Sequence, residues 1–363
     1  MIKILIISSE FPPGPGGIGA HAYNIANELY HKGNKVTVCT VSDYASPEDE
    51  KAFDIKCNFT VIRFVRYKNI FLNYFTRIIL ILKTINHNCI THVLCTGRFS
   101  IWVIIFLKFF KFKKIVAVLH GSEVGHGLKR KWLCFNLSLA NQIISVSSFS
   151  KNLLPPKLKS RARVIHNGIN LDQWDTTNIK SSLKQFPILL TVGSISYRKG
   201  QHNVVSAIPE IKKIFPNVHY HCVGPEREKK YLLKKIKQLS VGAHVTLNGV
   251  LTHSNLENIY AKAHINMMLS DQSTDGDVEG YGISVLEGNA FGIPAIGSIN
   301  SGLREAISPR VNGLLVNSKN QLEIVEAIKR IYTNYRQYSK LCQEYASNKL
   351  WSQQITLYEK YIF

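Results

Sequence analysis

Short apolar runs alternate with amphipathic stretches along nearly the whole chain, and this alternation restricts the possible folds more than any other feature. Lys3–Ser8 and Lys35–Thr40 have the length and composition of buried strands, and Gly19–His31 between them has helical spacing. Strands that alternate with helices form parallel sheets covered by helices, because each return crossing needs an element of its own. The sequence therefore predicts a doubly wound α/β fold.

The alternation occurs in two series. The expected strands of the first are Lys3–Ser8, Lys35–Thr40, Thr60–Phe64, His92–Cys95, Ile115–Leu119, Gln142–Val146 and Arg163–Ile165. Those of the second are Ile188–Val192, Val218–Val223, Val245–Leu247, Ile265–Leu269, Pro294–Gly297 and Gly313–Val316. The polar, turn-rich segment Asp175–Ser182 between them reads as a linker. We expect two Rossmann-like domains facing across a cleft, over residues 1–175 and 176–344, with a helix at about 345–363 packing back on the first.

The net charge of +21 is distributed unevenly. Residues 51–170 contain 20 lysines and arginines but only two acidic residues, Asp54 and Glu123. A basic surface on this part of the fold should attract an anionic partner. Charge alone leaves nucleic acid, acidic lipid and a phosphorylated acceptor open.

Several segments indicate in which cellular compartment the protein lies and whether the chain could span a membrane. Met1–Ile7 already has the pattern of a strand rather than a signal peptide, and the apolar run Ile101–Phe110 covers about half the roughly 20 residues that span a bilayer. The seven cysteines form no C-x-x-C pair, which fits a reducing compartment. We expect a cytoplasmic protein.

Residues 67–83 and 106–114 mix aromatic, aliphatic and basic residues, so they suit either an interfacial surface or core helices with outward-pointing cations.

A glycine-rich loop follows the first expected strand. Gly14, Gly16 and Gly19 satisfy G-x-G-x-x-G, but three prolines in the loop are unlike a tight dinucleotide-binding turn. Glycines and a following helix N-terminus still suit an anion such as a phosphate. The alternative is a turn that serves only the chain geometry.

Two glutamates eight residues apart give the strongest functional signal. Glycines at positions 280 and 282 suit a loop that opens into a helix, which places Glu279 in the loop and Glu287 one to two turns into the helix. Glu287 has small and apolar neighbours, so its carboxylate needs a partner. A ribose diol would supply one.

Basic and histidine side chains follow other expected strands. Arg198 and Lys199 come shortly after Ile188–Val192, where they could neutralise a diphosphate or form a solvated basic turn. His120 directly follows Ile115–Leu119, at the strand end where doubly wound folds bind ligands, although a lone histidine there is more often structural.

The segments FPPGPGGIGAHAYNIANEL and GDVEGYGISVLE, with its E-x7-E spacing, resemble the retaining glycosyltransferases of family 4. The similarity is greatest to bacterial mannosyl- and hexosyltransferases of envelope polysaccharide or glycolipid synthesis. It covers roughly Ile2 to Leu315, and it implies the GT-B fold. By this resemblance, Gly16 and Gly17 lie against the donor's diphosphate and the acceptor, and His120 faces the donor sugar.

In the second half, the resemblance implies that Glu279 contacts the donor sugar and that Glu287 binds the ribose. Family members usually have G-R-x4-K-G where this chain has Gly193 to Gly200, so Lys199 matches but Ser194 stands at the arginine position. Arg198 is therefore a candidate for the missing cation. Backbone contacts to sugar, phosphate or base are implied for Gly280, Tyr281, Gly282, Ile283 and Val250.

These features predict a retaining glycosyltransferase that needs neither a metal nor a bound cofactor. Its donor would be a nucleotide sugar, with GDP-mannose favoured over a UDP-hexose. Its acceptor would be a lipid-linked or glycan molecule, and we expect a peripheral protein on an anionic membrane at the inner face of the cell. Nucleic acid is disfavoured because no binding motif accompanies the charge. The alternatives are a nucleotide-sugar epimerase of the same architecture, an NAD-dependent oxidoreductase, and a non-enzymatic basic binding module.

Overall fold

The computed structural model describes residues 1–41, 44–177, 179, 183–273 and 276–363. Part of the predicted linker Asp175–Ser182 lies outside these residues. The chain forms two compact units, and each is described separately. Unit 1 comprises Met1–Asn167 and Trp351–Phe363, and unit 2 comprises Gly168–Leu350.

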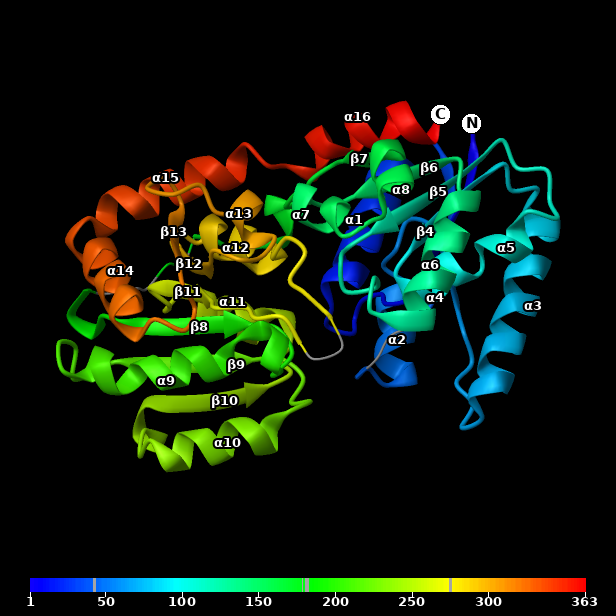
Figure 1. Cartoon of the computed structure of the whole chain (residues 1–363). Coiled ribbons are helices and arrows are strands. Elements are labelled where there is room, and N and C mark those ends of the chain that lie inside the picture. The colour runs from blue at the N-terminus through cyan, green and yellow to red at the C-terminus, as the bar shows by residue number, and fades with distance from the viewer. Residues whose placement is uncertain (42–43, 178, 180–182, 274–275) are drawn as a thin grey trace. The chain divides into compact units, whose positions relative to one another are not determined.

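Unit 1 is built on a seven-stranded parallel sheet with the order β3-β2-β1-β4-β5-β6-β7 (Figure 1). Its strands are β1 (Lys3–Ser8), β2 (Lys35–Thr40), β3 (Thr60–Arg63), β4 (His92–Thr96), β5 (Lys114–Leu119), β6 (Gln142–Ser145) and β7 (Ala162–Val164). Its helices are α1 (Gly17–His31), α2 (Pro47–Asp54), α3 (Ile70–Asn88), α4 (Arg98–Trp102), α5 (Ile104–Leu107), α6 (Gly127–Leu139), α7 (Ser148–Asn152), α8 (Pro156–Arg161) and α16 (Trp351–Ile362).

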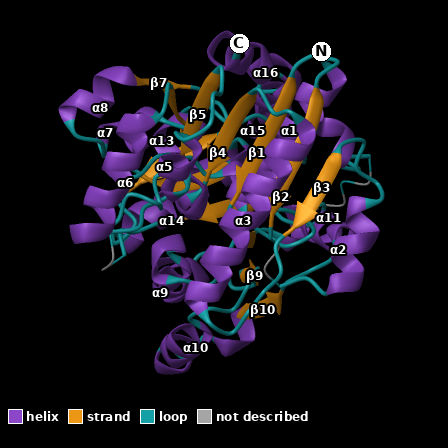
Figure 2. Ribbon diagram, turned by 90° about the vertical axis from the view of Figure 1, so that its right-hand side faces the viewer, coloured by secondary structure: helices purple, strands orange, loops and turns teal. Residues whose placement is uncertain are grey.

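Helices cover both faces of this sheet because alternate strand residues point to opposite sides. Leu5, Ile7 and their counterparts on neighbouring strands form one core with α3, α4, α5 and α6. Helix α1 packs against α16 in a second layer. In Figure 2 the first layer is seen from outside, with α3, α5 and α6 in front of the strands. No described helix is long and apolar enough to cross a bilayer.

Unit 2 is built on a six-stranded parallel sheet with the order β10-β9-β8-β11-β12-β13 (Figure 1). Its strands are β8 (Ile188–Val192), β9 (His219–Val223), β10 (Val245–Gly249), β11 (Ile265–Met268), β12 (Ala295–Ser298) and β13 (Gly313–Val316). Its α-helices are α9 (Gln201–Lys212), α10 (Lys229–Gln238), α11 (His253–Tyr260), α12 (Ile283–Ala290), α13 (Leu303–Ala306), α14 (Gln321–Thr333) and α15 (Tyr335–Ser347). Short 3-10 turns are η1 (Leu171–Gln173), η2 (Leu183–Gln185), η3 (Tyr197–Lys199) and η4 (Gly242–His244).

The division into units lies before the predicted linker. Ile169 forms a parallel bridge with Leu350, and the Trp174 ring lies 5.6 Å from that of Tyr260 and 5.9 Å from that of Phe291. The segment expected to end the first domain therefore belongs to unit 2. At the other end, α15 also packs within unit 2, so the chain rejoins unit 1 only at Trp351.

Candidate active site

The Arg198–Lys199 segment sits in a tight turn after β8. Ser196 caps this turn, since its Oγ accepts a hydrogen bond from the Lys199 N–H at 3.4 Å. Gly200 ends it in a left-handed conformation, with φ of +74°, and a Cβ there would lie 1.8 Å from the carbonyl oxygen of Leu269. Only glycine fits so close to the end of β11, so the turn fixes both basic side chains at the carboxyl edge of the sheet.

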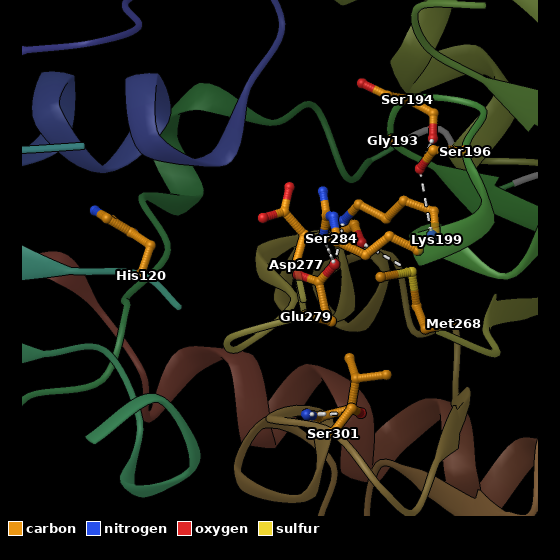
Figure 3. A network of polar contacts seen from close by, with 12 residues as sticks. His120, Gly193, Ser194, Ser196, Lys199, Met268, Asp277, Glu279, Ser284 and Ser301 are labelled. Carbon is orange, nitrogen blue, oxygen red and sulfur yellow. Dashed lines mark hydrogen bonds and ion pairs between the residues drawn. The ribbon is translucent and has the colours of Figure 1, made fainter. Parts of the chain in front are cut away.

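Both cations contact one carboxylate oxygen. Arg198 Nη1 lies 2.6 Å from Oε2 of Glu279. Lys199 Nζ lies 2.8 Å from the same oxygen (Figure 3). The side chains are largely enclosed, with 24%, 13% and 9% exposure for Arg198, Lys199 and Glu279. Burial alone would raise the pKa of Glu279, but the two cations outweigh it, so the pKa of Glu279 lies below its usual value. Glu279 is thus ionised, and the cluster keeps one net positive charge.

Burial lowers the pKa of Lys199, assisted by the neighbouring charge of Arg198 and opposed by Glu279. Its aliphatic stem also has a fixed course, because it passes over Gly193, where a Cβ would come within 2.9 Å of Lys199 Cε. The ammonium group is therefore held by its stem as well as by its ion pair. Such a preorganised cation can stabilise charge that develops nearby without reorganising.

The loop from Glu279 to Gly282 is held by the segment after β12. The Gly302 N–H donates to the Glu279 carbonyl at 2.9 Å, and a Cβ at Gly302 would lie 2.0 Å from the Gly280 carbonyl oxygen. Gly282 is the N-cap residue of α12, and Tyr281 beside it is buried. This contact sets the position of the Glu279 backbone and of the α12 N-terminus.

Glu287 lies on α12, as the spacing predicted, and it has a partner inside the protein. Its Oε2 accepts a hydrogen bond from the hydroxyl of Tyr260 at 2.8 Å. Burial raises the pKa of Glu287, opposed by the Tyr260 hydrogen bond and by the charges of Lys199 and His253. Sequence reasoning required a partner for Glu287 but could not identify Tyr260, which is 27 residues away.

His120 and Glu123 form a closed turn at the end of β5 in unit 1. The Glu123 carboxylate accepts hydrogen bonds from the N–H groups of His120 at 3.1 Å and Gly121 at 2.8 Å. The His120 ring contacts Thr96 through Nε2 at 2.8 Å and meets the His21 ring edge to face at 4.6 Å. Burial lowers the pKa of His120 to about 3, so the ring is neutral near pH 7.

The glycine-rich loop of unit 1 opens into α1. Gly16 directly precedes this helix and Gly17 is its first residue. The carbonyl of Gly16 accepts the first helical hydrogen bond, from Ala20 at 3.0 Å. Gly16 has no side chain to cap the helix, and the Glu10 carboxylate lies close to it, since a Cβ at Gly16 would be 2.2 Å from Glu10 Oε2.

Two family models match successive parts of the chain. Glycosyltransferase Family 4 matches residues 15–173, and Glycosyl transferases group 1 matches residues 172–349. The chain belongs to glycosyltransferase family 4. This membership confirms the predicted family and favours sugar transfer over the NAD-dependent oxidoreductase considered from the first glycine loop.

Curated relatives of this glycosyltransferase match most of its length. An uncharacterized glycosyltransferase of Methanocaldococcus jannaschii is 26% identical, over 92% of this chain and 90% of its own. A GDP-mannose-dependent alpha-(1-6)-phosphatidylinositol monomannoside mannosyltransferase of Mycobacterium tuberculosis is 23% identical, over 91% and 89%.

Solved structures resemble the fold of this glycosyltransferase over nearly the whole chain. Sucrose-phosphate synthase from Thermosynechococcus elongatus superposes with a TM-score of 0.81 at 20% identity, covering 99% of this chain and 98% of its own. HepE from Anabaena, in complex with UDP and glucose, gives 0.77 at 18%, covering 99% and 100%. With the two parallel sheets, these likenesses confirm the predicted GT-B fold.

The remaining predicted site residues lie outside the cluster formed by Arg198, Lys199 and Glu279. Ser194 is placed apart from Lys199 and Glu279 in Figure 3, and its carbonyl accepts a hydrogen bond from Gln201 at 3.1 Å. Val250 follows β10 and is 45% exposed. Among the residues that the structure describes, no group of three histidine, cysteine or acidic side chains is placed to hold a metal ion.

Replacing Glu123 by glutamine should change how the stability of the glycosyltransferase depends on pH. Burial raises the pKa of Glu123 to about 7 from an ordinary 4.5, partly opposed by the N–H groups of His120 and Gly121 and by Arg98. The folded wild type thus holds a proton that the unfolded chain releases, and this contribution to stability, present in full below about pH 4.5, is lost as pH rises through 7. Glutamine stays neutral throughout.

We therefore expect the melting temperature of Glu123→Gln, relative to wild type, to rise between about pH 5 and pH 8. Differential scanning fluorimetry at several pH values would measure it. A relative melting temperature that stays constant or falls with pH would contradict the expectation.

Proposed function

We propose that this glycosyltransferase is a retaining, metal-independent hexosyltransferase that uses a nucleoside-diphosphate sugar, with GDP-mannose favoured over a UDP-hexose. The observation that carries the proposal is the cluster in which Arg198 and Lys199 share one oxygen of Glu279. Its surplus positive charge lies in a largely enclosed place at the carboxyl edge of the unit 2 sheet, where doubly wound folds bind nucleotides. The relative from Mycobacterium tuberculosis is a GDP-mannose-dependent mannosyltransferase, which supports the choice of donor.

Each proposed contact pairs a group of the protein with a chemically complementary group of the donor. Arg198 and Lys199 neutralise the diphosphate, and Gly280, Tyr281, Gly282 and Ile283 offer backbone N–H groups at the start of α12. Glu279 accepts hydroxyls of the sugar, and Glu287 accepts a ribose hydroxyl. Val250 contributes backbone contacts to the base. In unit 1, Gly16 and Gly17 bind phosphate or acceptor, and neutral His120 orients the sugar.

In the proposed reaction, the acceptor hydroxyl attacks the anomeric carbon from the face that the nucleotide leaves, so the configuration is retained. The bond from that carbon to the phosphate oxygen breaks with both electrons going to the nucleoside diphosphate. The new bond to the acceptor oxygen forms, and the acceptor proton leaves with the phosphate. Lys199, with Arg198, stabilises the charge that grows on the leaving group.

The proposed acceptor is a lipid-linked or glycan molecule. The name of the relative from Mycobacterium tuberculosis refers to phosphatidylinositol monomannoside, which supports a lipid-linked acceptor. Such an acceptor would bring the enzyme to a membrane surface as a peripheral protein on the cytoplasmic side.

A panel of nucleotide sugars in a thermal-shift assay tests the donor. GDP-mannose should raise the melting temperature of the full chain more than UDP-glucose or UDP-N-acetylglucosamine, because a ligand that binds the native state stabilises it. NAD should leave it unchanged. If no nucleotide sugar shifts the melting temperature or is even slowly hydrolysed, the proposal is wrong. NMR analysis of the product separates transfer from epimerisation, since an epimerase changes the sugar without any acceptor.

A further inference from the structure

Large apolar side chains project outward from the helical layer of unit 1 that covers the Leu5–Ile7 side of its sheet. On α3, Phe71 and Phe75 are 81% and 63% exposed. They are one turn apart, while Tyr74 and Ile78 on the same helix pack against the core. The outward phenylalanines therefore contribute little to the core of unit 1.

Helix α6 repeats this arrangement within the same layer. Leu128 is 82% exposed, and Trp132 and Phe135, at 42% and 46%, stack on each other with ring centroids 5.6 Å apart. Helix α4 joins the two helices, because its Phe99 contacts Tyr74 of α3 at 5.5 Å between ring centroids and α4 packs on α6. Figure 2 shows α3, α5 and α6 together in front of the strands.

The charges in this layer have one sign. Between Asp54 and Glu123 the sequence contains no acidic residue, and α6 contains none either. Lysines are exposed beside the apolar side chains and have no carboxylate within ion-pair distance among the described residues: Lys68, Lys108, Lys111, Lys129 and Lys131. Unpaired cations next to protruding aromatic rings match the chemistry of anionic headgroups above an acyl boundary.

We propose that this docking face, made of Phe71 and Phe75 on α3, Leu128, Trp132 and Phe135 on α6 and the lysines named above, binds an anionic lipid bilayer. The rings enter the headgroup boundary and the lysines contact acidic headgroups. Membrane binding by this docking face deepens the proposed function. It rests on that function only for the reason to bind a membrane, which is to bring the enzyme to a lipid-linked acceptor.

Co-sedimentation of the full chain with lipid vesicles tests the docking face. The protein should bind vesicles of phosphatidylcholine mixed with phosphatidylglycerol, and should bind phosphatidylcholine alone much more weakly. Phe71→Ser with Phe75→Ser, and separately Lys129→Glu with Lys131→Glu, should each weaken binding at least about tenfold. The matched control is Leu233→Ser with Lys234→Glu on α10 of unit 2, where both residues are exposed on a lysine-rich helix.

Failure to bind mixed vesicles, an equal loss in the α10 control, or a preference for RNA over mixed vesicles would each overturn the docking face. Thermal shift with the nucleotide sugar is measured on the same variants and should match wild type. If donor binding is absent in every protein, including wild type, the proposed function fails while the vesicle result still stands on its own.

A separate observation concerns Tyr260 in unit 2. Its hydroxyl is 2.8 Å from Glu287 Oε2, and its fully buried ring stacks on Phe291 at 5.3 Å and meets Trp174 edge-on at 5.6 Å. Packing on both sides therefore fixes the direction of the hydroxyl. Since a phenol has one proton to donate, it holds one carboxylate oxygen and leaves the other for a ligand.

The geometry points to Tyr260 as a positioning residue that orients Glu287 toward a hydroxyl of the donor. This inference also rests on the proposed function. The groups whose charges act on Glu287 are Lys199 and, when protonated, His253, while the Tyr260 hydroxyl donates a hydrogen bond to it. Because hydrogen bonding to the carboxylate favours its ionised form, losing the Tyr260 hydroxyl should raise the pKa of Glu287 further.

Tyr260→Phe should raise the KM for the donor about fivefold to tenfold with little change in kcat, which corresponds to the loss of one such hydrogen bond. The acidic limb of the kcat/KM profile should move to higher pH. Tyr220→Phe is the matched control, since Tyr220 is equally buried in unit 2 and donates to Thr191 instead.

An unmoved acidic limb, or the same movement in Tyr220→Phe, would overturn the positioning role. If the wild type neither binds nor turns over any nucleotide sugar, the proposed function has failed. In that case the pKa of Glu287 followed by NMR in wild type and Tyr260→Phe still decides whether the hydroxyl controls this carboxylate.

Discussion

Replacing Lys199 by alanine is expected to lower the kcat of sugar transfer by about 10²–10³-fold, the usual effect of removing one preorganised group that stabilises developing charge. Its ammonium lies 2.8 Å from Glu279, and its stem is fixed over Gly193. The diphosphate gains an additional negative charge as its bond to the sugar breaks, so kcat should fall more than the KM for the donor rises. Steady-state kinetics with GDP-mannose and a soluble acceptor analogue would measure both.

Matched variants separate charge from geometry at this position. Lys199→Arg keeps the charge and should recover part of the loss, while Arg198→Ala should cost less, because Arg198 is more exposed. Adding Ser194→Arg to Arg198→Ala restores the usual family arginine and should recover activity if Arg198 replaces it. Equal kcat values for Lys199→Ala and wild type would show that Lys199 does not stabilise the leaving group.

The sheets were the most predictable part of the fold. Lys3–Ser8, Lys35–Thr40, Ile188–Val192 and Gly313–Val316 form strands with the bounds that their apolar runs predicted. The remaining predicted strands form within one or two residues of their expected ends. Strands buried on both faces by helices are continuous apolar runs, so their limits are visible in the sequence.

The division between units was less predictable because it depends on tertiary contacts. The polar segment after Trp174 predicts a linker, yet Ile169 and Trp174 already pack in unit 2 against Leu350, Tyr260 and Phe291. Such pairings join residues far apart in the sequence. No local pattern could have placed the change of unit at Asn167.

The candidate site shows the same contrast. The spacing of glycines and glutamates placed Glu279 in a loop and Glu287 on a helix, because glycine marks a helix start locally. It could not show that Arg198 and Lys199 share one oxygen of Glu279. Arg198 is 81 residues from Glu279 in the sequence, and the loops after β8 and β11 bring the two side chains together.

The aromatic and basic segments of unit 1 suited either an interfacial surface or core helices, and α3 contains both buried and exposed apolar side chains. In α3, Tyr74 and Ile78 belong to the core, as expected of a core helix, whereas Phe71 and Phe75 point outward. Composition could not divide these residues because both sets are apolar. Their helical phase relative to the sheet decides which side chains are free to meet a bilayer.

Replacing Glu287 by alanine should weaken binding of the donor by about 10- to 100-fold, because a hydrogen bond to a charged acceptor contributes roughly 1.5–3 kcal/mol. The Tyr260 hydroxyl would also lose its acceptor. In wild type, the raised pKa of Glu287 should make donor affinity decline as pH falls through that pKa, since a protonated carboxyl accepts hydrogen bonds less well. Glu287→Gln stays neutral and should lack this acidic decline.

Isothermal titration calorimetry with GDP-mannose across the acidic range would measure both effects. Glu326→Gln, on α14 of the same unit and exposed beside Lys329, is the control and should bind the donor as wild type does. Unchanged affinity in Glu287→Ala would show that this carboxylate does not meet the donor. An acidic decline that persists in Glu287→Gln would assign the titration to another group.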